Sequence, residues 1–319
     1  MTMRSMISKV VYSDNKTLTS IRKLLVRIPF IDRITSDIAF KKNMSDKEYI
    51  SMLYHEYFGV YPDLNNPRNF NEKNNWRKLY DRKPLYTLMV DKYRIKDIIK
   101  ERAGEEHTFP LLKVWDRAED IDISTLPEKF VLKANHAGGV IICRDKSTFD
   151  LKKAIRELKR DLKVDYYSHS REWPYKNVER KVIAEKYMGE NLVDFKNYCF
   201  NGKVYYTLVW SNHSRSDGHK PDGYFCGAYD REWKKTSMEL DYYTEDTIYP
   251  KPSCYEEMVE VAEKMSAGIP FVRVDCYIID NHVYVGEMTF FPWGGFQKFK
   301  DEKWNNYLGE LEVLPEKTV

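Results

Sequence analysis

The chain has 319 residues, enough for a large core and for two domains, and its 52 basic and 49 acidic residues leave a formal charge of +3 that argues against nucleic-acid binding through bulk charge. Its five cysteines are odd in number and never form a Cys-x-x-Cys pair, so we expect neither a disulfide framework nor a zinc site, and a reducing cytoplasm fits. The absence of a run of about 18 apolar residues and of an apolar signal-peptide region argues against a membrane span and against secretion by that route.

Residues 1–60 are expected to form a basic helical extension. Its central segment, residues 20–34, interleaves apolar residues with Arg22, Lys23, Arg27 and Arg33. Such a segment suits contact with an anionic membrane or a partner, although it is more often a solvated helix packed on its own domain.

Residues 61–125 are expected to be a helical region. The segment 67–79 begins with cap-type residues, and the segment 91–100 carries apolar residues at helical spacing.

The next region, residues 126–190, is rich in predicted strands. Strands over 130–134 and 140–143 flank the segment Asn135–Gly139, a helix follows from Leu151 to Leu162, and a further strand covers 181–188.

Residues 191–319 contain two predicted hairpins and a helix. Strands 195–200 and 203–209 flank Asn201–Gly202, a strong signal for a hairpin turn, and a helix is expected around 256–266. The chain is also rich in aromatic residues, with 24 Tyr and 7 Trp, which suit stacking on sugars or bases but more often serve half-buried packing.

The second hairpin, Phe271–Pro292, carries charges that suggest a metal and nucleotide site. Side chains alternate along a strand, so Arg273 and Asp275 share one face, and so do Glu287 and Thr289. A three-residue loop, Asp280–His282, places Asp275 opposite Glu287 and Arg273 opposite Thr289, with opposed Cβ atoms roughly 5 Å apart. Two carboxylates at this separation repel each other unless a cation lies between them. A Mg²⁺ ion that also binds phosphates would be a suitable cation. A plain hairpin with a cross-strand ion pair is the alternative.

Lys133 ends a predicted strand just before the glycine pair Gly138 and Gly139. Small residues let backbone N–H groups approach phosphates and a lysine adds a point charge, so this segment suits a phosphate-covering loop, although most such units are plain turns. His136 in the same loop could donate to a phosphate or be only a solvated side chain.

Two further features carry little information alone. The backbone at the edge Glu185–Met188 could bind a purine base. Asp194 and Lys196 share one strand face, where Asp194 suits ribose hydroxyls and Lys196 suits a phosphate. A surface ion pair between these two residues is the alternative.

The order of these features resembles the ATP-grasp superfamily and, within it, the TupA-like family of teichuronopeptide biosynthesis, which occurs with polysaccharide-building enzymes. The resemblance covers about residues 66–314. It rests on Asn69–Lys73, Asp91–Tyr93, Leu126–His136, Ala184–Tyr187, Asp194–Lys203, Phe271–Asp275, Gly286–Phe290 and Gly294–Phe296. It implies an α+β fold in which two α+β subdomains with antiparallel sheets, residues 126–190 and 191–319, hold a nucleotide between them, after a helical N-terminal region.

The resemblance also implies roles for individual residues. Lys92 and Lys133 would hold the α- and β-phosphates, and Asn135–Gly139 would be a mobile loop over the γ-phosphate. Glu185, Lys186 and Met188 would read adenine, and Asp194 would bind the ribose beside Lys196. Asp275 and Glu287 would ligate Mg²⁺, while Arg273 would neutralise the transferred phosphoryl group. The candidate catalytic residues are Arg273, Lys133 and His136.

One departure from the superfamily concerns the metal site. The residue two after the metal glutamate is usually asparagine, whereas Thr289 stands here, and a hydroxyl is a poorer ligand than an amide carbonyl. The second metal position is therefore left open.

The resemblance implies an ATP-dependent carboxylate–amine ligase that forms an amide through an acyl phosphate. The expected partners are ATP, Mg²⁺, a uronic acid carboxylate of a surface polysaccharide or its precursor, and an amine or amino acid. A sugar kinase and an inactive scaffold for capsule assembly are the alternatives. We expect acceptor specificity to lie in residues 204–252 and in the turn Phe291–Phe296, and we expect a cytoplasmic protein, with the membrane surface as an alternative location.

Overall fold

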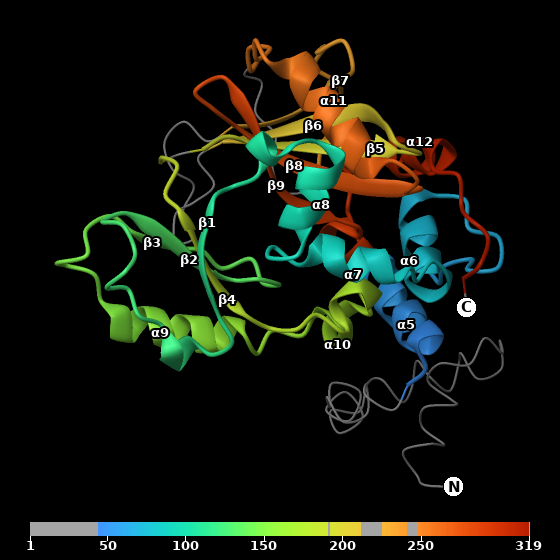
Figure 1. Ribbon diagram of the computed structural model, residues 1–319. Coiled ribbons are helices and arrows are strands. Elements are labelled where there is room, and N and C mark those ends of the chain that lie inside the picture. The colour runs from blue at the N-terminus through green and yellow to red at the C-terminus, as the bar shows by residue number, and fades with distance from the viewer. Residues whose placement is uncertain (1–43, 191, 212–224, 241–247, 319) are drawn as a thin grey trace, which may run out of the picture.

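The computed structural model describes residues 44–190, 192–211, 225–240 and 248–318, which form two antiparallel sheets with helices packed on them (Figure 1). The expected α+β architecture with two antiparallel sheets is confirmed. The basic segment 20–34 lies outside the described residues.

The first sheet has four strands in the order β1-β4-β2-β3. These are β1 (Leu111–Trp115), β2 (Phe130–Ala134), β3 (Ile141–Cys143) and β4 (Val182–Lys186). Helix α9 (Leu151–Asp161) packs on the sheet through Leu158, which is fully buried together with Phe130 and Leu132. Strand β1 lies within residues 61–125, which we expected to be helical, and it pairs with β4. This strand was not predicted from the sequence, because alternation of burial is weak along it.

The second sheet has five strands in the order β7-β6-β5-β8-β9. These are β5 (Asp194–Phe200), β6 (Lys203–Ser211), β7 (Phe225–Asp230), β8 (Phe271–Ile279) and β9 (His282–Thr289). The predicted turn at Asn201–Gly202 is confirmed, and both residues have the positive φ, 50° and 78°, that a two-residue hairpin turn requires.

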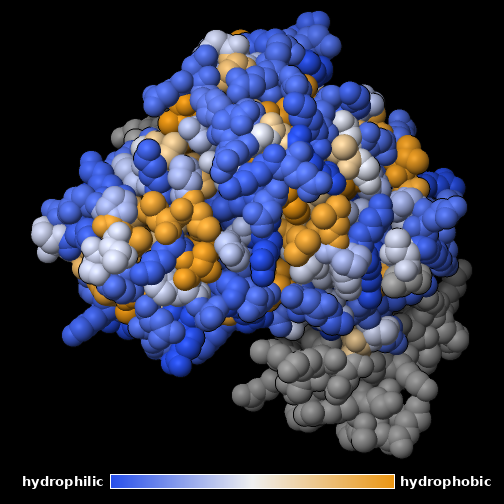
Figure 2. All heavy atoms as spheres, in the orientation of Figure 1, coloured by the Kyte–Doolittle hydropathy of each residue, from blue (hydrophilic) through white to orange (hydrophobic). Residues whose placement is uncertain are grey.

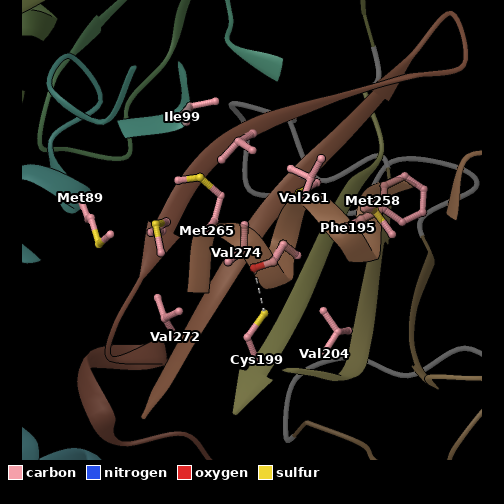
Figure 3. Close-up of a cluster of buried hydrophobic side chains, with 14 of the residues drawn as sticks. Met89, Ile99, Phe195, Cys199, Val204, Met258, Val261, Met265, Val272 and Val274 are labelled. Carbon is pink, nitrogen blue, oxygen red and sulfur yellow. Dashed lines mark hydrogen bonds between the residues drawn. The ribbon is translucent and has the colours of Figure 1, made fainter. Parts of the chain in front are cut away.

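One face of this sheet carries the largest apolar core (Figure 3). Helix α11 (Tyr255–Ser266) packs Met258, Val261 and Met265 against Cys199 and Val274 of the strands. Helices α7 (Pro84–Val90) and α8 (Ile95–Arg102) add Met89 and Ile99 to the same core. Residues alternate along each strand, so the other face carries a second apolar cluster around Phe70, Phe200 and Phe271, together with the polar side chains of Asp194, Lys196 and Asp275.

Four further helices and four 3₁₀ turns complete the described parts of the chain. They are α5 (Asp46–Phe58), α6 (Phe70–Tyr80), α10 (Tyr166–Ser170), α12 (Lys303–Leu311) and the 3₁₀ turns η1 (Glu105–His107), η2 (Ala118–Asp120), η3 (Trp173–Tyr175) and η4 (Pro292–Gly295). Asn69 begins α6 with a capping box to Glu72, which explains why the predicted helix starts at the expected motif.

Helix α6 is buried although its side chains are mostly polar. Asn71, Asn74, Asn75, Arg77 and Lys78 are all fully buried. Asn75 donates to the carbonyl of Gly295 at 2.7 Å, and Asn71 donates to the carbonyl of Gln297 at 2.8 Å. The helix therefore organises the C-terminal segment through hydrogen bonds, as buried polar groups require.

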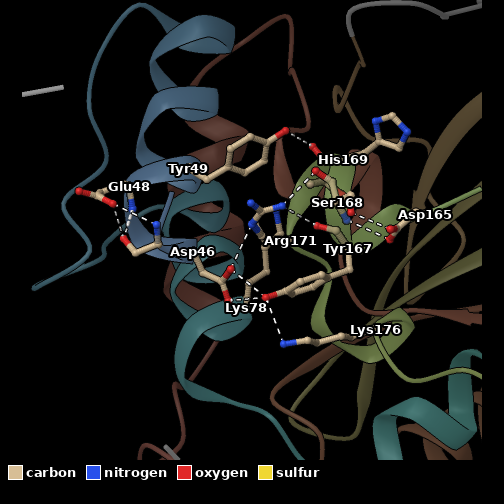
Figure 4. A network of polar contacts seen from close by, with 12 residues as sticks. Asp46, Glu48, Tyr49, Lys78, Asp165, Tyr167, Ser168, His169, Arg171 and Lys176 are labelled. Atoms are coloured by element: carbon tan, nitrogen blue, oxygen red, sulfur yellow. Dashed lines mark hydrogen bonds and ion pairs between the residues drawn. The ribbon is translucent and has the colours of Figure 1, made fainter. Parts of the chain in front are cut away.

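A cluster of polar contacts fixes α5 to α10 (Figure 4). The Arg171 guanidinium lies 3.0 Å from the Asp46 carboxylate and 4.0 Å from the ring centroid of Tyr49. The Tyr167 hydroxyl donates to the same carboxylate at 2.9 Å. Arg171 is buried and adopts a left-handed φ of 57°, which few residues other than glycine take without help from their surroundings.

Gly309 of α12 packs directly on the start of α6. A Cβ atom at this position would lie 2.4 Å from the carbonyl oxygen of Arg68 and 2.7 Å from the backbone of Asn69. We therefore expect Gly309→Ala to lower the free energy of unfolding by about 1–3 kcal/mol, as measured by urea denaturation. Asn306→Ala, at an exposed site on the same helix, is the control, and equal stability of the two variants would contradict this packing.

The face of the molecule shown in Figure 2 is mainly hydrophilic, with separate hydrophobic patches. None of the helices in the described ranges is long and apolar enough to cross a membrane.

Candidate functional site

The hairpin β8–β9 pairs its charged residues as the sequence predicts. Asp275 lies opposite Glu287, and Arg273 lies opposite Thr289. The expected three-residue loop is wrong, because Ile279 pairs with His282 and the turn consists of Asp280 and Asn281 alone, both with positive φ.

A bulge corrects the register that a two-residue turn would otherwise give. The pairing shifts between Asp275 and Cys276, so Gly286 is the extra residue of β9. A Cβ on Gly286 would lie 2.5 Å from the Tyr277 ring, so a larger residue does not fit there without movement. The bulge returns Glu287 to the face of Asp275.

Three cations surround these carboxylates. Arg273 donates to both oxygens of Asp275 at 2.6 Å, and Lys196 lies 2.9 Å from one of them. Lys196 also pairs with Asp194 at 2.5 Å, and both of these side chains are buried, so this is not the surface ion pair considered above. The repulsion expected between Asp275 and Glu287 is thus relieved by protein cations.

Glu287 and Thr289 extend this cluster. Lys92 lies 3.0 Å from the Glu287 carboxylate, whose side chain is 37% exposed. The Thr289 hydroxyl accepts a hydrogen bond of 3.0 Å from Arg273. Lys92, distant in sequence, is therefore brought onto the β8–β9 hairpin.

The charges of the cluster affect one another's protonation. Lys92 holds the pKa of Glu287 well below its usual range, so Glu287 stays ionised. Burial raises the pKa of Asp194 to about 6, an effect that Lys196 partly offsets. One carboxylate oxygen of Asp194, Oδ1, is buried without a hydrogen-bond partner.

A second cluster lies on the first sheet. Glu185 is 4% exposed and accepts contacts from Lys133 at 2.6 Å and from Lys96 at 2.5 Å. Burial alone would raise the pKa of Glu185, but the two ammonium groups outweigh it and lower that pKa. The side chain predicted to read adenine is thus engaged by two lysines.

The two clusters approach each other across Phe109. The Lys133 ammonium lies 5.8 Å from the Phe109 ring centroid, and this ring contacts the Tyr277 ring at 5.7 Å between centroids. Tyr277 lies on the face of β8 that carries Arg273 and Asp275. The structure therefore places both predicted charge groups at the facing sides of the two sheets.

The predicted loop Asn135–Gly139 divides into an anchored and an open part. Asn135 is fully buried, and its amide bonds the carbonyl of Glu179 and the N–H of Lys181, each at 2.8 Å. His136 is also buried, contacts the carbonyl of Val164 at 3.1 Å, and has a pKa lowered by burial. Gly138 is exposed and Gly139 is half-buried, so the glycines are the part of this segment that faces outward.

The edge after β4 is more open than Glu185. Lys186 is exposed, with its N–H bonded to the carbonyl of Pro110 at 3.0 Å, and Met188 is half-buried. The three residues predicted to read adenine therefore do not form one cluster of contacts.

Sequence reasoning missed Lys96 and Tyr166. Lys96 lies in α8 four residues after Lys92, but Lys92 precedes that helix, so helical spacing does not place the two lysines on one face. Burial raises the pKa of Tyr166, and the charges of Lys92 and Glu287 act on the same hydroxyl, so this side chain lies near the hairpin cluster. Nothing in its surrounding polar sequence indicated this position.

The donor set on the hairpin fits Mg²⁺ in one respect. Within the parts of the chain that the structure describes, no group of three or more His, Cys, Asp or Glu side chains is placed to hold a metal. Mg²⁺ is commonly bound by one or two carboxylates together with substrate phosphates and water, which matches the pair Asp275 and Glu287.

Comparisons with known proteins give one extended match. The family model described as TupA-like ATPgrasp matches residues 72–313. A search of curated proteins gave no match.

Solved structures show weaker likeness. A D-alanine–D-alanine ligase from Helicobacter pylori has 17% identity and a TM-score of 0.41, with 72% of this chain and 62% of that chain covered. An L-amino acid ligase from Bacillus licheniformis has 14% identity and a TM-score of 0.40, with 64% and 44% covered. An N5-carboxyaminoimidazole synthetase from Staphylococcus aureus, solved with ADP, has 15% identity and a TM-score of 0.39, with 86% and 60% covered. This chain thus spans less than two thirds of each of these structures, and no function is transferred from them.

Proposed function

Because this chain belongs to the TupA-like ATP-grasp family, we propose that it is an ATP-dependent ligase that joins a carboxylate to an amine. The observation that carries the proposal is the cluster on the β8–β9 hairpin, where Arg273, Lys196 and Lys92 lie on the opposed carboxylates Asp275 and Glu287. Paired cations and carboxylates of this kind suit phosphoryl transfer, which depends on positioning and charge neutralisation.

We propose that, when the nucleotide binds, the cations of these ion pairs leave their carboxylate partners and contact phosphate groups. Lys92 and Lys133 would turn to the α- and β-phosphates, and Arg273 and Lys196 would face the γ-phosphate. Gly138 and Gly139 would cover the phosphates from the open part of their loop, beside His136. Asn135 would hold that loop to residues 179–181, because its side chain is already engaged there.

The ribose would lie beside the second sheet, and the base would lie at the edge of the first sheet, after β4. The buried, unpartnered Oδ1 of Asp194 fits a ribose hydroxyl, since a buried acceptor without a donor costs about 1–3 kcal/mol. Adenine would meet the edge Lys186–Met188, while Glu185 would keep Lys133 and Lys96 in position.

Asp275 and Glu287 would hold Mg²⁺, and Thr289 would adjoin it. When bound, this ion would polarise the phosphate oxygens and offset their negative charge. The protein's own part is to orient the carboxylates, which the bulge at Gly286 does by placing Glu287 opposite Asp275.

The proposed reaction needs no protein nucleophile. A carboxylate oxygen of the acceptor attacks the γ-phosphorus, the bond to the β-phosphate oxygen breaks, and ADP leaves. The amine nitrogen then attacks the acyl carbon, phosphate leaves with its bridging oxygen, and the amine proton passes to solvent.

We propose that the acceptor is a uronic acid of a surface polysaccharide or its precursor. We also propose that the protein is cytoplasmic and that residues 1–60 contact the membrane surface or an assembly partner.

Isotope transfer tests this proposal. With ¹⁸O in the carboxylate of a uronic acid and an amine or amino acid present, labelled phosphate and ADP should appear together with an amide. AMP and pyrophosphate instead would indicate an adenylating ligase, and stable phosphate on a sugar hydroxyl would indicate a kinase. Absence of any ATP turnover with all tested acceptors would favour an inactive scaffold.

A further inference from the structure

Two tryptophans from distant parts of the chain meet beside the charged hairpin. Trp210 belongs to β6 and Trp293 to η4, and their ring centroids lie 6.5 Å apart with an angle of 38° between the planes. Residues 204–252 and 291–296 are the two segments in which acceptor specificity is expected, and these indoles join them.

Trp293 is held in an exposed position by a constrained turn. Its side chain is 46% exposed, although a large apolar ring gains free energy by burial. Trp293, Gly294 and Gly295 have φ values of 54°, 64° and 80°, and this conformation is costly for a tryptophan.

Helix α6 supports this turn from beneath. Lys78 donates to the carbonyl of Gly294, and Asn75 donates to the carbonyl of Gly295 at 2.7 Å. A Cβ on Gly295 would lie 3.0 Å from the Lys78 side chain, so the contact is close. These hydrogen bonds hold the backbone of the turn that carries the exposed indole.

Trp210 links the pair to the charged cluster. It lies opposite Asp194 on β5, and the Lys196 ammonium is 5.5 Å from its ring centroid. The same ammonium contacts Asp275 at 2.9 Å. The indoles thus border the cations that would face the γ-phosphate.

We infer that Trp210 and Trp293 form a platform for the pyranose ring of a uronic acid acceptor, an inference that rests on the proposed ligase function. One face of a pyranose ring presents C–H groups, which pack on the electron-rich face of an indole. The carboxylate on such a ring matches the charge of the neighbouring Lys196 and Arg273, whereas a neutral sugar lacks that match. An amino acid has the carboxylate but no ring to lie on the indoles.

Calorimetric titration of the full chain tests the platform without turnover. The probes are a tetrasaccharide of glucuronic acid, glutamate as a carboxylate without a sugar ring, and ATP with Mg²⁺. Trp293→Asn removes the ring while asparagine tolerates the left-handed turn. This variant should bind the tetrasaccharide at least tenfold more weakly and should bind ATP as the unmodified chain does.

Two further variants sharpen the test. Trp293→Phe keeps an aromatic face and should lose less saccharide affinity than Trp293→Asn. Tyr307→Ala removes an exposed aromatic from α12, at 41% exposure and outside residues 204–252 and 291–296, and should change neither affinity. Thermal unfolding of all variants identifies any that fail to fold, and Trp293→Phe then gives the comparison.

The possible failures can be told apart. Unchanged tetrasaccharide binding by Trp293→Asn, equal losses for tetrasaccharide and ATP, or stronger binding of glutamate than of the tetrasaccharide would each overturn the platform. If the unmodified chain binds the tetrasaccharide through Trp293 but forms no amide, the platform stands and the ligase proposal fails. If amide forms from a uronic acid with the same KM in Trp293→Asn, the ligase proposal stands and the platform fails.

Discussion

Glu287→Gln should reduce phosphate release from ATP by about a hundredfold or more while the protein still folds. The glutamine keeps the shape of the side chain but removes the charge that Lys92 contacts at 3.0 Å and that would bind Mg²⁺. The Lys92 side chain is only 13% exposed, but the glutamine amide oxygen can still accept a hydrogen bond from its ammonium group. Steady-state assays over a range of Mg²⁺ concentrations measure the effect.

Glu263→Gln is the matched control for this variant. Glu263 also pairs with a lysine, Lys203 at 2.6 Å, and its side chain is 23% exposed, but it lies on α11 at the opposite face of the sheet. This control should keep its rate. An unchanged rate for Glu287→Gln, with the Mg²⁺ dependence preserved, would remove Glu287 from the proposed metal site.

Asp275 is a less suitable position for the same test. It is 1% exposed and neutralises both Arg273 and Lys196, so its removal would leave two buried cations short of a partner. Breaking a buried pair in this way typically costs about 3–5 kcal/mol. The loss of activity expected for Asp275→Ala would therefore be mixed with a loss of stability.

Lys133→Met should raise the KM for ATP by about 10- to 150-fold and lower turnover. A charge-assisted contact to phosphate contributes about 1.5–3 kcal/mol, and the methionine retains most of the apolar volume of the side chain. The variant should still fold, because Glu185 keeps its contact with Lys96 at 2.5 Å. Initial-rate kinetics and equilibrium binding of ATP measure both effects.

Lys159→Met provides the control in the same subdomain. Lys159 lies on α9, its ammonium group is 2.7 Å from the Glu119 carboxylate, and its side chain is 45% exposed. Its loss should therefore leave ATP binding unchanged. Equal ATP affinity for Lys133→Met and the unmodified chain would reduce Lys133 to a structural partner of Glu185.

Local patterns in the sequence were sufficient for several elements. The turn at Asn201–Gly202, strand β2 and helix α9 follow from turn chemistry and periodicity, which act between near neighbours. The face shared by Arg273 and Asp275 also follows, because alternation along a strand is a local property.

The features that failed depend on contacts between distant residues. The turn at Asp280–Asn281 was misjudged because an odd number of loop residues was assumed to be needed to place Asp275 opposite Glu287. The bulge at Gly286 supplies the extra residue instead. The burial of the polar helix α6 could not be read from its composition, since its partners Gly295 and Gln297 lie more than 200 residues away in sequence. Lys96 was overlooked because it lies on α8, whereas its partner Glu185 lies on β4, far away in sequence.

The contact between Arg171 and Asp46 bears on where this protein can be cut. The family match begins at residue 72, so an excised catalytic fragment chosen by that match would lack Asp46 and Tyr49. Its Arg171 guanidinium would lose both the carboxylate and the aromatic ring that now enclose it, at a backbone position that already needs external support. We therefore expect a fragment that begins at residue 72 to be less stable than one that retains α5.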